Sequence, residues 1–386
     1  MPGYELIGSE EQAEVADVFE RGGVLFRHGF EDSRNGCYKV AEFERNFINT
    51  VNASYGLAVS SGTAALRIAL AALGIGYGDE VITQCFTFVA TVEAIIESGA
   101  TPVCADIDLT LNLDPYDLER RITSRTKAVI AVHMLGVPAR LKEIQSICER
   151  HGLKLIEDAA WGCGGKLMGK NLGTWGDIGT FSFDYAKTMT TGEGGMLTFK
   201  DDSTYLRAAA WHDHGHENNP NVPRWEDTRT SSGFNFRMME LQGALGLAQL
   251  RKLDRVINAQ KGNYTAIWNS IKHIAGIEAR EIPGGSDITA DAFVFLVPNK
   301  DKAISCRQEL LNTGIKTKIL PEAIGWHFAG EWSHMRQLVH SHGGNLKEEF
   351  NKSKTILDRA VSVPVGVHQL ADIPYVIHQA LEKALS

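Results

Sequence analysis

The pattern of apolar and polar positions between residues 55 and 199 changes regularly along the chain. Short apolar runs rich in β-branched residues predict strands, and stretches with apolar residues three and four positions apart predict helices. We expect strands at 55–60, 80–83, 102–106, 127–133, 153–157, 178–183 and 195–199, with helices at 64–73, 86–97 and 141–151. Such alternation favours an α/β domain with a parallel sheet, whose ligands bind at the carboxyl ends of the strands.

Helical patterns flank this region on both sides. Residues 10–21 and 42–51 predict helices before it, and residues 204–211 and 238–254 predict helices after it. The remaining chain predicts a helix, short strands at 292–297 and 316–319, and closing helices. Because 386 residues exceed the size of one typical domain, we expect two: a large α/β domain at 1–255 and a smaller α+β domain at 256–386.

Composition narrows the class of protein. Hydrophobic residues make up 44% of the chain and charged residues 22%, with a formal net charge of −8. These values are typical of a folded globular protein and give no basic surface for nucleic acid or an anionic membrane. No apolar run reaches the ~20 residues that span a bilayer, and the first residues lack an export signal, so we expect a cytoplasmic protein. Six cysteines without CxxC spacing indicate reduced thiols.

The first candidate for chemistry is Lys187, on a polar, glycine-rich loop between two predicted strands. A lysine held near apolar and aromatic side chains has its ammonium form disfavoured, so its amine can attack a carbonyl. From composition alone, a solvated surface lysine is the alternative.

Two further candidates follow predicted strands. The Ser-Gly-Thr turn at 61–63 leads into a helix, and the N–H groups at a helix N-terminus bind phosphate. A simple N-cap by Ser61 or Thr63 is the alternative. Asp158 ends another strand among apolar neighbours, where a carboxylate needs a cationic partner. An ion pair with Arg or Lys is one explanation, and a cofactor is the other.

Five segments resemble motifs of the pyridoxal-phosphate (PLP) sugar aminotransferases of the StrS/DegT family, and they occur in the same order and with the same spacing as in that family. They are VSSGTAAL at 59–66, TFVAT at 87–91, IEDAA at 156–160, FSF at 181–183 with Lys187 and TTGEGG at 190–195, and GFNFRMMELQ at 233–242. The resemblance runs through nearly the whole chain. It implies fold type I of PLP-dependent aminotransferases, with a mostly parallel seven-stranded sheet in the large domain and a smaller α+β C-terminal domain. It also implies a homodimer with shared active sites.

The resemblance assigns roles to individual residues. Lys187 would hold PLP as a Schiff base and move the proton, with pyridoxamine phosphate as an intermediate, and Asp158 would hold the ring nitrogen. The implied cofactor contacts are Gly62, Thr63, Ala64, Phe88, Asp158, Trp161, Ser182 and Lys187, with Asn235 reaching the phosphate from the other chain of the dimer. Trp161 departs from the family pattern, which commonly has Gln or a similar polar residue at this place.

A polar segment at 212–217 carries three histidines and two carboxylates in six positions. These groups suit zinc and similar ions, but their spacing matches no recognised ligand pattern, and the family needs no metal, so we expect none. We expect instead that they help to bind a polar or acidic sugar; a solvated loop is the alternative. The candidate substrate contacts are His212, His214, His216, Arg224, Arg229 and His327.

The implied reaction moves an amino group from L-glutamate to a sugar carbonyl. Within the family, the chain is most similar to the transaminases that make 8-amino-3,8-dideoxy-manno-octulosonate for lipopolysaccharide, which implies an acceptor with a C8 aldehyde. A nucleotide-linked keto-deoxyhexose is the main alternative. A PLP-dependent sugar dehydratase is disfavoured because that branch replaces the lysine with histidine. A non-catalytic regulatory relative would be expected to lose Lys187 or Asp158, and both are present.

Overall fold

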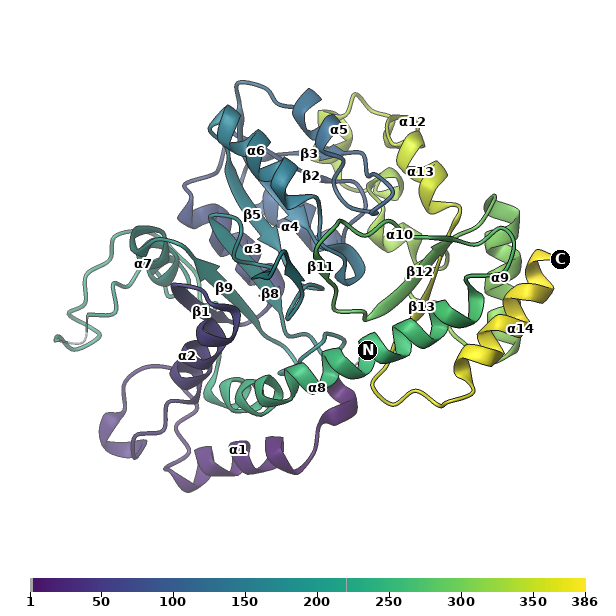
Figure 1. Cartoon of the computed structure of the whole chain (residues 1–386). Coiled ribbons are helices and arrows are strands. Elements are labelled where there is room, and N and C mark those ends of the chain that lie inside the picture. Colours follow the sequence, from purple (N-terminus) through teal and green to yellow (C-terminus); the bar gives the residue numbers. More distant parts are fainter. Residues whose placement is uncertain (1–2, 220) are drawn as a thin grey trace.

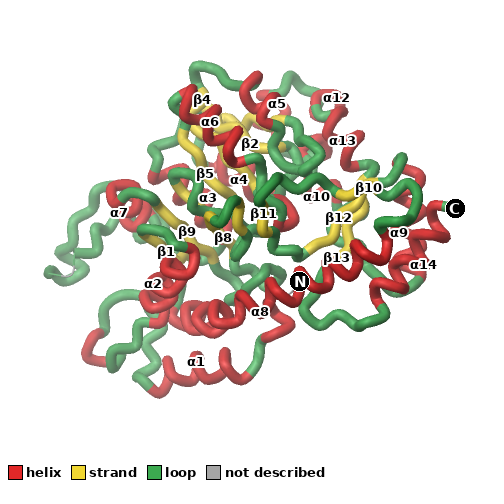
Figure 2. Tube along the Cα trace, in the orientation of Figure 1, coloured by secondary structure: helices red, strands yellow, loops and turns green. Residues whose placement is uncertain are grey.

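A seven-stranded sheet forms the centre of the computed structural model, which describes residues 3–219 and 221–386. Its strand order is β1-β9-β8-β5-β4-β2-β3 (Figures 1 and 2). The strands are β1 (Tyr55–Val59), β2 (Glu80–Gln84), β3 (Thr101–Ala105), β4 (Thr126–Val132), β5 (Lys154–Asp158), β8 (Ile178–Ser182) and β9 (Gly195–Phe199). β9 runs opposite to the other six because the loop with Lys187 folds the chain back beside β8. The expected mostly parallel seven-stranded sheet is confirmed.

Both faces of this sheet are covered by apolar side chains and helices. Successive residues of a strand point to opposite faces, and Leu155 and Ile156 accordingly lie in two different buried apolar clusters. In the sequence, these strands therefore appear as continuous apolar runs rather than as alternating apolar and polar residues. The surrounding helices are α3 (Gly62–Ala72), α4 (Val89–Glu97), α5 (Pro115–Arg120), α6 (Leu141–His151) and α7 (Asp202–Trp211), with the 3-10 turn η3 (Met134–Gly136).

Helix α8 (Glu240–Ile271) links the large sheet to the C-terminal part of the chain. The sequence pattern ended this helix at residue 254, but Ile257, Ile267 and Ile271 continue its buried face. The proposed boundary between residues 255 and 256 therefore lies inside one continuous helix. Helices α1 (Ser9–Glu20) and α2 (Lys39–Val51) pack against α8, as does α14 (Ile373–Leu385) (Figure 1). Two 3-10 turns, η1 (Gly3–Leu6) and η2 (Glu31–Ser33), complete the N-terminal region.

The C-terminal part contains a second, antiparallel sheet in the order β10-β12-β13. The expected strand at 316–319 is wrong, because Ile319 has a φ of 69°, a left-handed conformation outside the strand region. β13, which the pattern missed, pairs with β12 instead. The elements are β10 (Glu278–Ala279), β12 (Ala292–Leu296), β13 (Ala360–Pro364), α9 (Lys300–Asn312), α10 (Ile324–His327), η4 (Ala329–Glu331), α11 (Arg336–Ser341), α12 (Leu346–Glu349) and α13 (Asn351–Leu357).

One apolar cluster joins the two parts of the molecule. It contains Phe86 and Trp161 from loops of the large sheet, and Val294 and Ile319 from the C-terminal part. A small sheet of β6 (Lys166–Leu167), β7 (Lys170–Asn171) and β11 (Ser286–Asp287) adds a second connection. Residues that follow β5 are thereby packed against residues around β12. Among residues 3–219 and 221–386 we find no membrane-spanning helix.

Candidate active site

A cavity of about 320 Å³ opens at the carboxyl ends of the parallel strands. Residues just after β1, β2, β5 and β8 contribute to its wall, as expected for ligand sites of α/β sheets. Most of the residues that the sequence proposed for cofactor binding line this one cavity: Gly62, Thr63, Phe88, Asp158, Trp161, Ser182 and Lys187, together with His327 from the proposed substrate set. The tertiary structure thus brings together residues that are up to 265 positions apart, from Gly62 to His327.

Lys187 projects from the loop between β8 and β9. The loop is tightened by the Lys187 N–H, which donates to the Asp184 carbonyl at 3.0 Å, and by the Gly3 N–H, which donates to the Lys187 carbonyl at 3.0 Å. Desolvation lowers the pKa of the Lys187 ammonium to about 8, although the charge of Asp158 acts in the opposite direction. A substantial fraction of this lysine is therefore a neutral amine near pH 8, as a nucleophile requires.

Asp158 ends β5 and is 5% exposed. Its Oδ2 accepts a hydrogen bond from Thr91 Oγ1 at 3.0 Å, and its Oδ1 accepts one from the Ala160 N–H at 3.2 Å. Burial raises the pKa of this carboxyl, while these hydrogen bonds and Lys187 lower it. No Lys, Arg or His in the described residues forms an ion pair with Asp158, so the structural ion pair considered as an alternative is not found. A cationic ring nitrogen fits this place.

The N-terminus of α3 forms another side of the cavity. Ser61 caps the helix, since its Oγ accepts the Ala64 N–H at 3.0 Å. The proposed alternative of an N-cap is therefore present, and it engages the N–H of Ala64, a residue that does not line the cavity. The first N–H groups of the helix, at Gly62 and Thr63, have no partner within the helix and favour an anion. A Cβ at Gly62 would lie 2.7 Å from Ser182 Cβ, so only glycine leaves the Ser182 hydroxyl room here.

Three rings complete the wall. Phe88 is 41% exposed and lies 5.6 Å from the His327 ring, with 46° between the two planes. Burial lowers the pKa of His327. The Trp161 ring also lines the cavity, and its centroid is 3.8 Å from Lys187 Nζ. The cavity therefore offers an amine, a carboxylate, a helix N-terminus and aromatic surfaces, which is the set of groups that a flat phosphorylated aldehyde needs.

The profile of the DegT/DnrJ/EryC1/StrS aminotransferase family matches residues 11–380. The chain belongs to this family. The resemblance noted from the sequence motifs is thereby confirmed.

The names of proteins similar in sequence to this aminotransferase family member refer to sugar biosynthesis. It is similar to the spore coat polysaccharide biosynthesis protein SpsC of Bacillus subtilis, with 41% identity over 260 residues, covering 64% of this chain and 63% of that protein. It is also similar to the GDP-perosamine synthase of Vibrio cholerae, with 37% identity over 263 residues, covering 68% of each chain. The chain thus spans slightly less than two thirds of the length of the first of these relatives.

Solved structures share the fold almost from end to end. The aminotransferase from Psychrobacter cryohalolentis superposes with a TM-score of 0.86 at 26% identity, covering 98% of this chain and 96% of that one. The same fold occurs in the PLP-form and the PMP-form of Spr1654 from Streptococcus pneumoniae, with TM-scores of 0.82 and 0.83 at 23% and 22% identity, covering 98% of this chain and 98% and 96% of those chains. The expected fold is confirmed.

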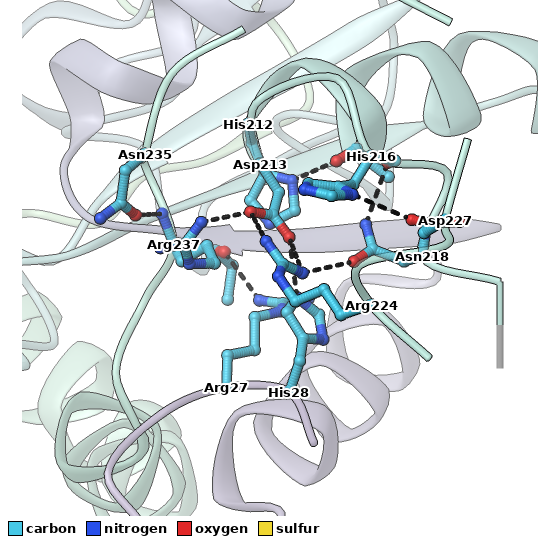
Figure 3. Close-up of polar contacts among 12 residues, drawn as sticks. Arg27, His28, His212, Asp213, His216, Asn218, Arg224, Asp227, Asn235 and Arg237 are labelled. Carbon is cyan, nitrogen blue, oxygen red and sulfur yellow. Dashed lines mark hydrogen bonds and ion pairs between the residues drawn. The ribbon is translucent and has the colours of Figure 1, made fainter. Parts of the chain in front are cut away.

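Asn235 and most of the proposed substrate residues lie elsewhere. His212, His214, His216, Arg224 and Arg229 do not line the cavity that contains Lys187. They belong to the segment between α7 and α8, which extends away from the sheet (Figure 1), and several of them form a polar cluster around Asp213 (Figure 3). Asn235 forms an isolated β-bridge with Asp213.

Opposite charges hold this Asp213 cluster together. Arg224 donates to both carboxylate oxygens of Asp213, at 2.8 and 2.5 Å, and Arg237 donates to Oδ1 (Figure 3). Burial alone would raise the pKa of Asp213, but the two guanidinium groups hold it well below its usual range. Burial and the charge of Arg27 lower the pKa of His28 to about 4 and that of His212 to about 3, so both imidazoles are neutral at pH 7.

Two histidines of this segment are engaged by protein groups through Nδ1. His212 Nδ1 contacts the Ala209 carbonyl, and His216 Nδ1 lies 3.2 Å from Asp227 Oδ2. In the described residues, no three His, Cys, Asp or Glu side chains come together as a metal site.

Sequence reasoning missed Thr91, Arg237 and Asp213. Thr91 stands one helical turn after Thr87 in the TFVAT segment, a spacing that would have placed both hydroxyls on one face of the helix. Arg237 and Asp213 are 24 residues apart, and only the fold shows that they are partners.

Proposed function

We propose that this protein is a PLP-dependent aminotransferase that transfers the amino group of L-glutamate to a sugar carbonyl. The observation that carries the proposal is the placing of Lys187 and Asp158 in the wall of one cavity, beside the N-terminus of α3. Bound PLP supplies an electron sink for the negative charge that develops on the donor's α-carbon. The family profile and the similarity to sugar-biosynthesis proteins support the same assignment.

The residues of the chain take distinct parts in this reaction. Lys187 moves the proton at the donor's α-carbon, and its pKa of about 8 lets it act as a base and then as an acid near neutral pH. Asp158 binds the cationic ring nitrogen, and Thr91 orients the carboxylate. The first N–H groups of α3 and the Ser182 hydroxyl bind the phosphate.

An absorption spectrum tests the cofactor assignment. The purified protein with added PLP should absorb in the visible at ~410–430 nm through the bond to Lys187, and Lys187→Ala should abolish this band. Lys170→Ala is the matched control, since Lys170 lies on the surface strand β7 beside Trp175. A wild-type protein without the band, or an unchanged band in Lys187→Ala, would refute the role of Lys187.

We further propose that the active site is shared in a homodimer, with Asn235 contacting the phosphate bound by the other chain. Asn235 does not line the cavity of its own chain and lies instead beside the Asp213 cluster (Figure 3), which supports this arrangement. Mixing Lys187→Ala protein with Asn235→Ala protein should restore activity, because one site of each mixed dimer then holds both native residues. If Asn235 served its own chain, every site of the mixture would lack one residue, and no activity would return.

For the acceptor we propose an acidic sugar aldehyde, 3,8-dideoxy-8-oxo-manno-octulosonate. Arg224 and Arg237 share the single carboxylate of Asp213, so these two guanidinium groups carry one positive charge more than the carboxylate between them, which suits a substrate carboxylate brought to them across the proposed dimer. A nucleotide-linked keto-deoxyhexose is the second candidate, favoured by the similarity to a GDP-perosamine synthase. Product formation with the octulosonate and none with GDP-, UDP- or dTDP-keto sugars would support the first. The reverse result would establish the second, and a glutamate requirement in either assay tests the donor.

A further inference from the structure

Two lysines contact the ring of Trp161. Lys187 Nζ lies 3.8 Å from the ring centroid and Lys318 Nζ lies 4.7 Å from it. Both distances are within the ~6 Å range in which an ammonium is attracted to the negative face of an aromatic ring. Trp161 is 7% exposed, so water competes little for these contacts. The polar residue common at this place in the family could not provide such a surface.

The Lys318 ammonium is fixed by Asp291. Lys318 Nζ donates to Asp291 Oδ2 at 2.5 Å and to the Asp291 carbonyl at 3.1 Å, and the two side chains are 3% and 1% exposed. The Lys318 N–H donates to the Ser362 carbonyl of β13 at 2.8 Å. This ion pair therefore belongs to the C-terminal part of the molecule.

Trp161 itself is anchored to both parts of the molecule. It follows β5, three positions after Asp158, and its carbonyl accepts a hydrogen bond from Thr289 Oγ1 at 3.2 Å. Its ring belongs to the apolar cluster that includes Ile319 and Val294. The indole thus contacts both the lysine of the β8–β9 loop and the Lys318 ammonium of the C-terminal part.

We propose that Trp161 is the resting place of the Lys187 ammonium whenever that lysine is free, and that the Lys318–Asp291 pair holds the indole in position for it. Trp161 and Lys318 are thus positioning residues for Lys187. The proposal rests on the role assigned to Lys187 under Proposed function, where the lysine must leave the cofactor and then act as a free base. A docked ammonium stays near the reacting atoms instead of turning toward solvent.

Several charged groups bear on the protonation of Lys187. Asp158, Asp184 and Asp291 favour its ammonium form, whereas Lys318 disfavours it. His327, from α10, also lies close enough to be affected by the charge of Lys187. The indole adds an attraction for the charged form that requires no negative residue. Weakening only the attraction between the indole and the ammonium should therefore lower the pH at which Lys187 loses its proton.

Fluorinated tryptophans test the ring without changing its shape. Full-length protein freed of cofactor, with mono-, di- or trifluorotryptophan placed at position 161 only, is labelled with acetic anhydride across a pH range. Acetylation of Lys187 is then followed by peptide mass spectrometry. Each fluorine weakens the attraction, so the midpoint should fall stepwise, by on the order of one pH unit over the series. A midpoint that does not move with fluorination would overturn the proposal while leaving the transaminase assignment intact.

Variants of the Lys318–Asp291 ion pair provide a second test of the proposal. Lys318→Met leaves Asp291 unopposed, so the labelling midpoint of Lys187 should rise. The double variant Lys318→Met with Asp291→Asn removes both charges and with them the ion pair that holds the indole, so the midpoint should fall below the wild-type value. A double variant that keeps the wild-type midpoint would refute the part given to Lys318. Because the double variant buries no unpaired charge, it remains informative if the single variant does not fold.

Discussion

Thr91 Oγ1 donates a 3.0 Å hydrogen bond to Asp158 Oδ2, and Thr87 Oγ1 lies 2.9 Å from Thr91 Oγ1. Because Thr91 uses its only proton for Asp158, Thr87 is the donor in the second bond. The Thr87 N–H in turn donates to the His327 carbonyl at 2.8 Å. A chain of hydrogen bonds thus connects the C-terminal part of the molecule to the carboxylate proposed to bind the cofactor ring.

Replacing Thr91 should impair catalysis through Asp158. Thr91→Val keeps the shape of the side chain but removes the hydrogen bond, which should lower kcat/KM by about 10- to 100-fold. Thr91→Ser keeps the hydroxyl and should retain most of the activity. Steady-state kinetics of the two variants provide the comparison, and equal activity of the Val and Ser variants would contradict the orienting role of Thr91.

Lys187 should reduce stability in the cofactor-free protein, in a pH-dependent way. Its pKa falls from 10.5 to about 8 on folding, so the folded state binds fewer protons than the unfolded state between these values. The cost of charging the lysine is fully present below pH 8 and disappears as the pH rises toward 10.5. Lys187→Met should therefore stabilise the protein at pH 7 by on the order of 2–3 kcal/mol.

Denaturant unfolding of wild type and Lys187→Met at pH 7 and pH 10 measures this difference. The advantage of the Met variant should shrink at the higher pH, since the folded lysine is then neutral and no longer pays the cost of a buried charge. A difference that stays constant between the two pH values would mean that the lysine is not desolvated.

Glu157, which precedes Asp158 in β5, should contribute strongly to the stability of the folded protein. Its carboxylate points away from Asp158 and accepts the N–H groups of Gly173, Trp175 and Gly176 at 2.9, 2.5 and 2.8 Å. His133 Nε2 lies 3.0 Å from Glu157 Oε2, and both side chains are fully buried. Glu157→Gln sets an amide NH₂ against these donors and should cost about 3 kcal/mol.

Thermal unfolding checks this prediction against an exposed carboxylate. Glu119→Gln is the control, because Glu119 pairs with Arg150 at the surface, where ion pairs contribute little. If the two variants melt at the same temperature, the buried hydrogen bonds of Glu157 do not stabilise the fold.

Two glycines of α8 should respond oppositely to alanine. A Cβ at Gly243 would lie 2.6 Å from the Val40 backbone N in α2, so Gly243→Ala should force the helices apart and cost about 1–3 kcal/mol. At Gly262 no atom lies within 4 Å of an added Cβ, so Gly262→Ala should stabilise the helix by up to ~1 kcal/mol. Unfolding midpoints of the two variants should move in opposite directions, and a stabilising Gly243→Ala would contradict the close α2–α8 packing.

Local sequence pattern was sufficient to locate the elements of the large sheet and to single out the residue types of the site. Its strands read as apolar runs buried on both faces, and helical spacing separates them, so local pattern alone located them to within a few residues. Lys187 and Asp158 stand out for a similar reason, since each is a charged side chain placed between apolar segments where burial requires a partner. The family motifs gave these two residues their roles.

Which of these residues meet depends on the fold of the whole chain, which no local pattern records. It extended α8 past the proposed boundary, replaced the expected strand at 316–319 with β13, and put Asn235 and the histidine segment outside the cavity of their own chain. It also brought Lys318 to the ring of Trp161, although 157 positions separate the two residues. The periodicity of the sequence indicates which face of a helix or strand is buried. Only the long-range packing of the chain determines which residues contact that buried face.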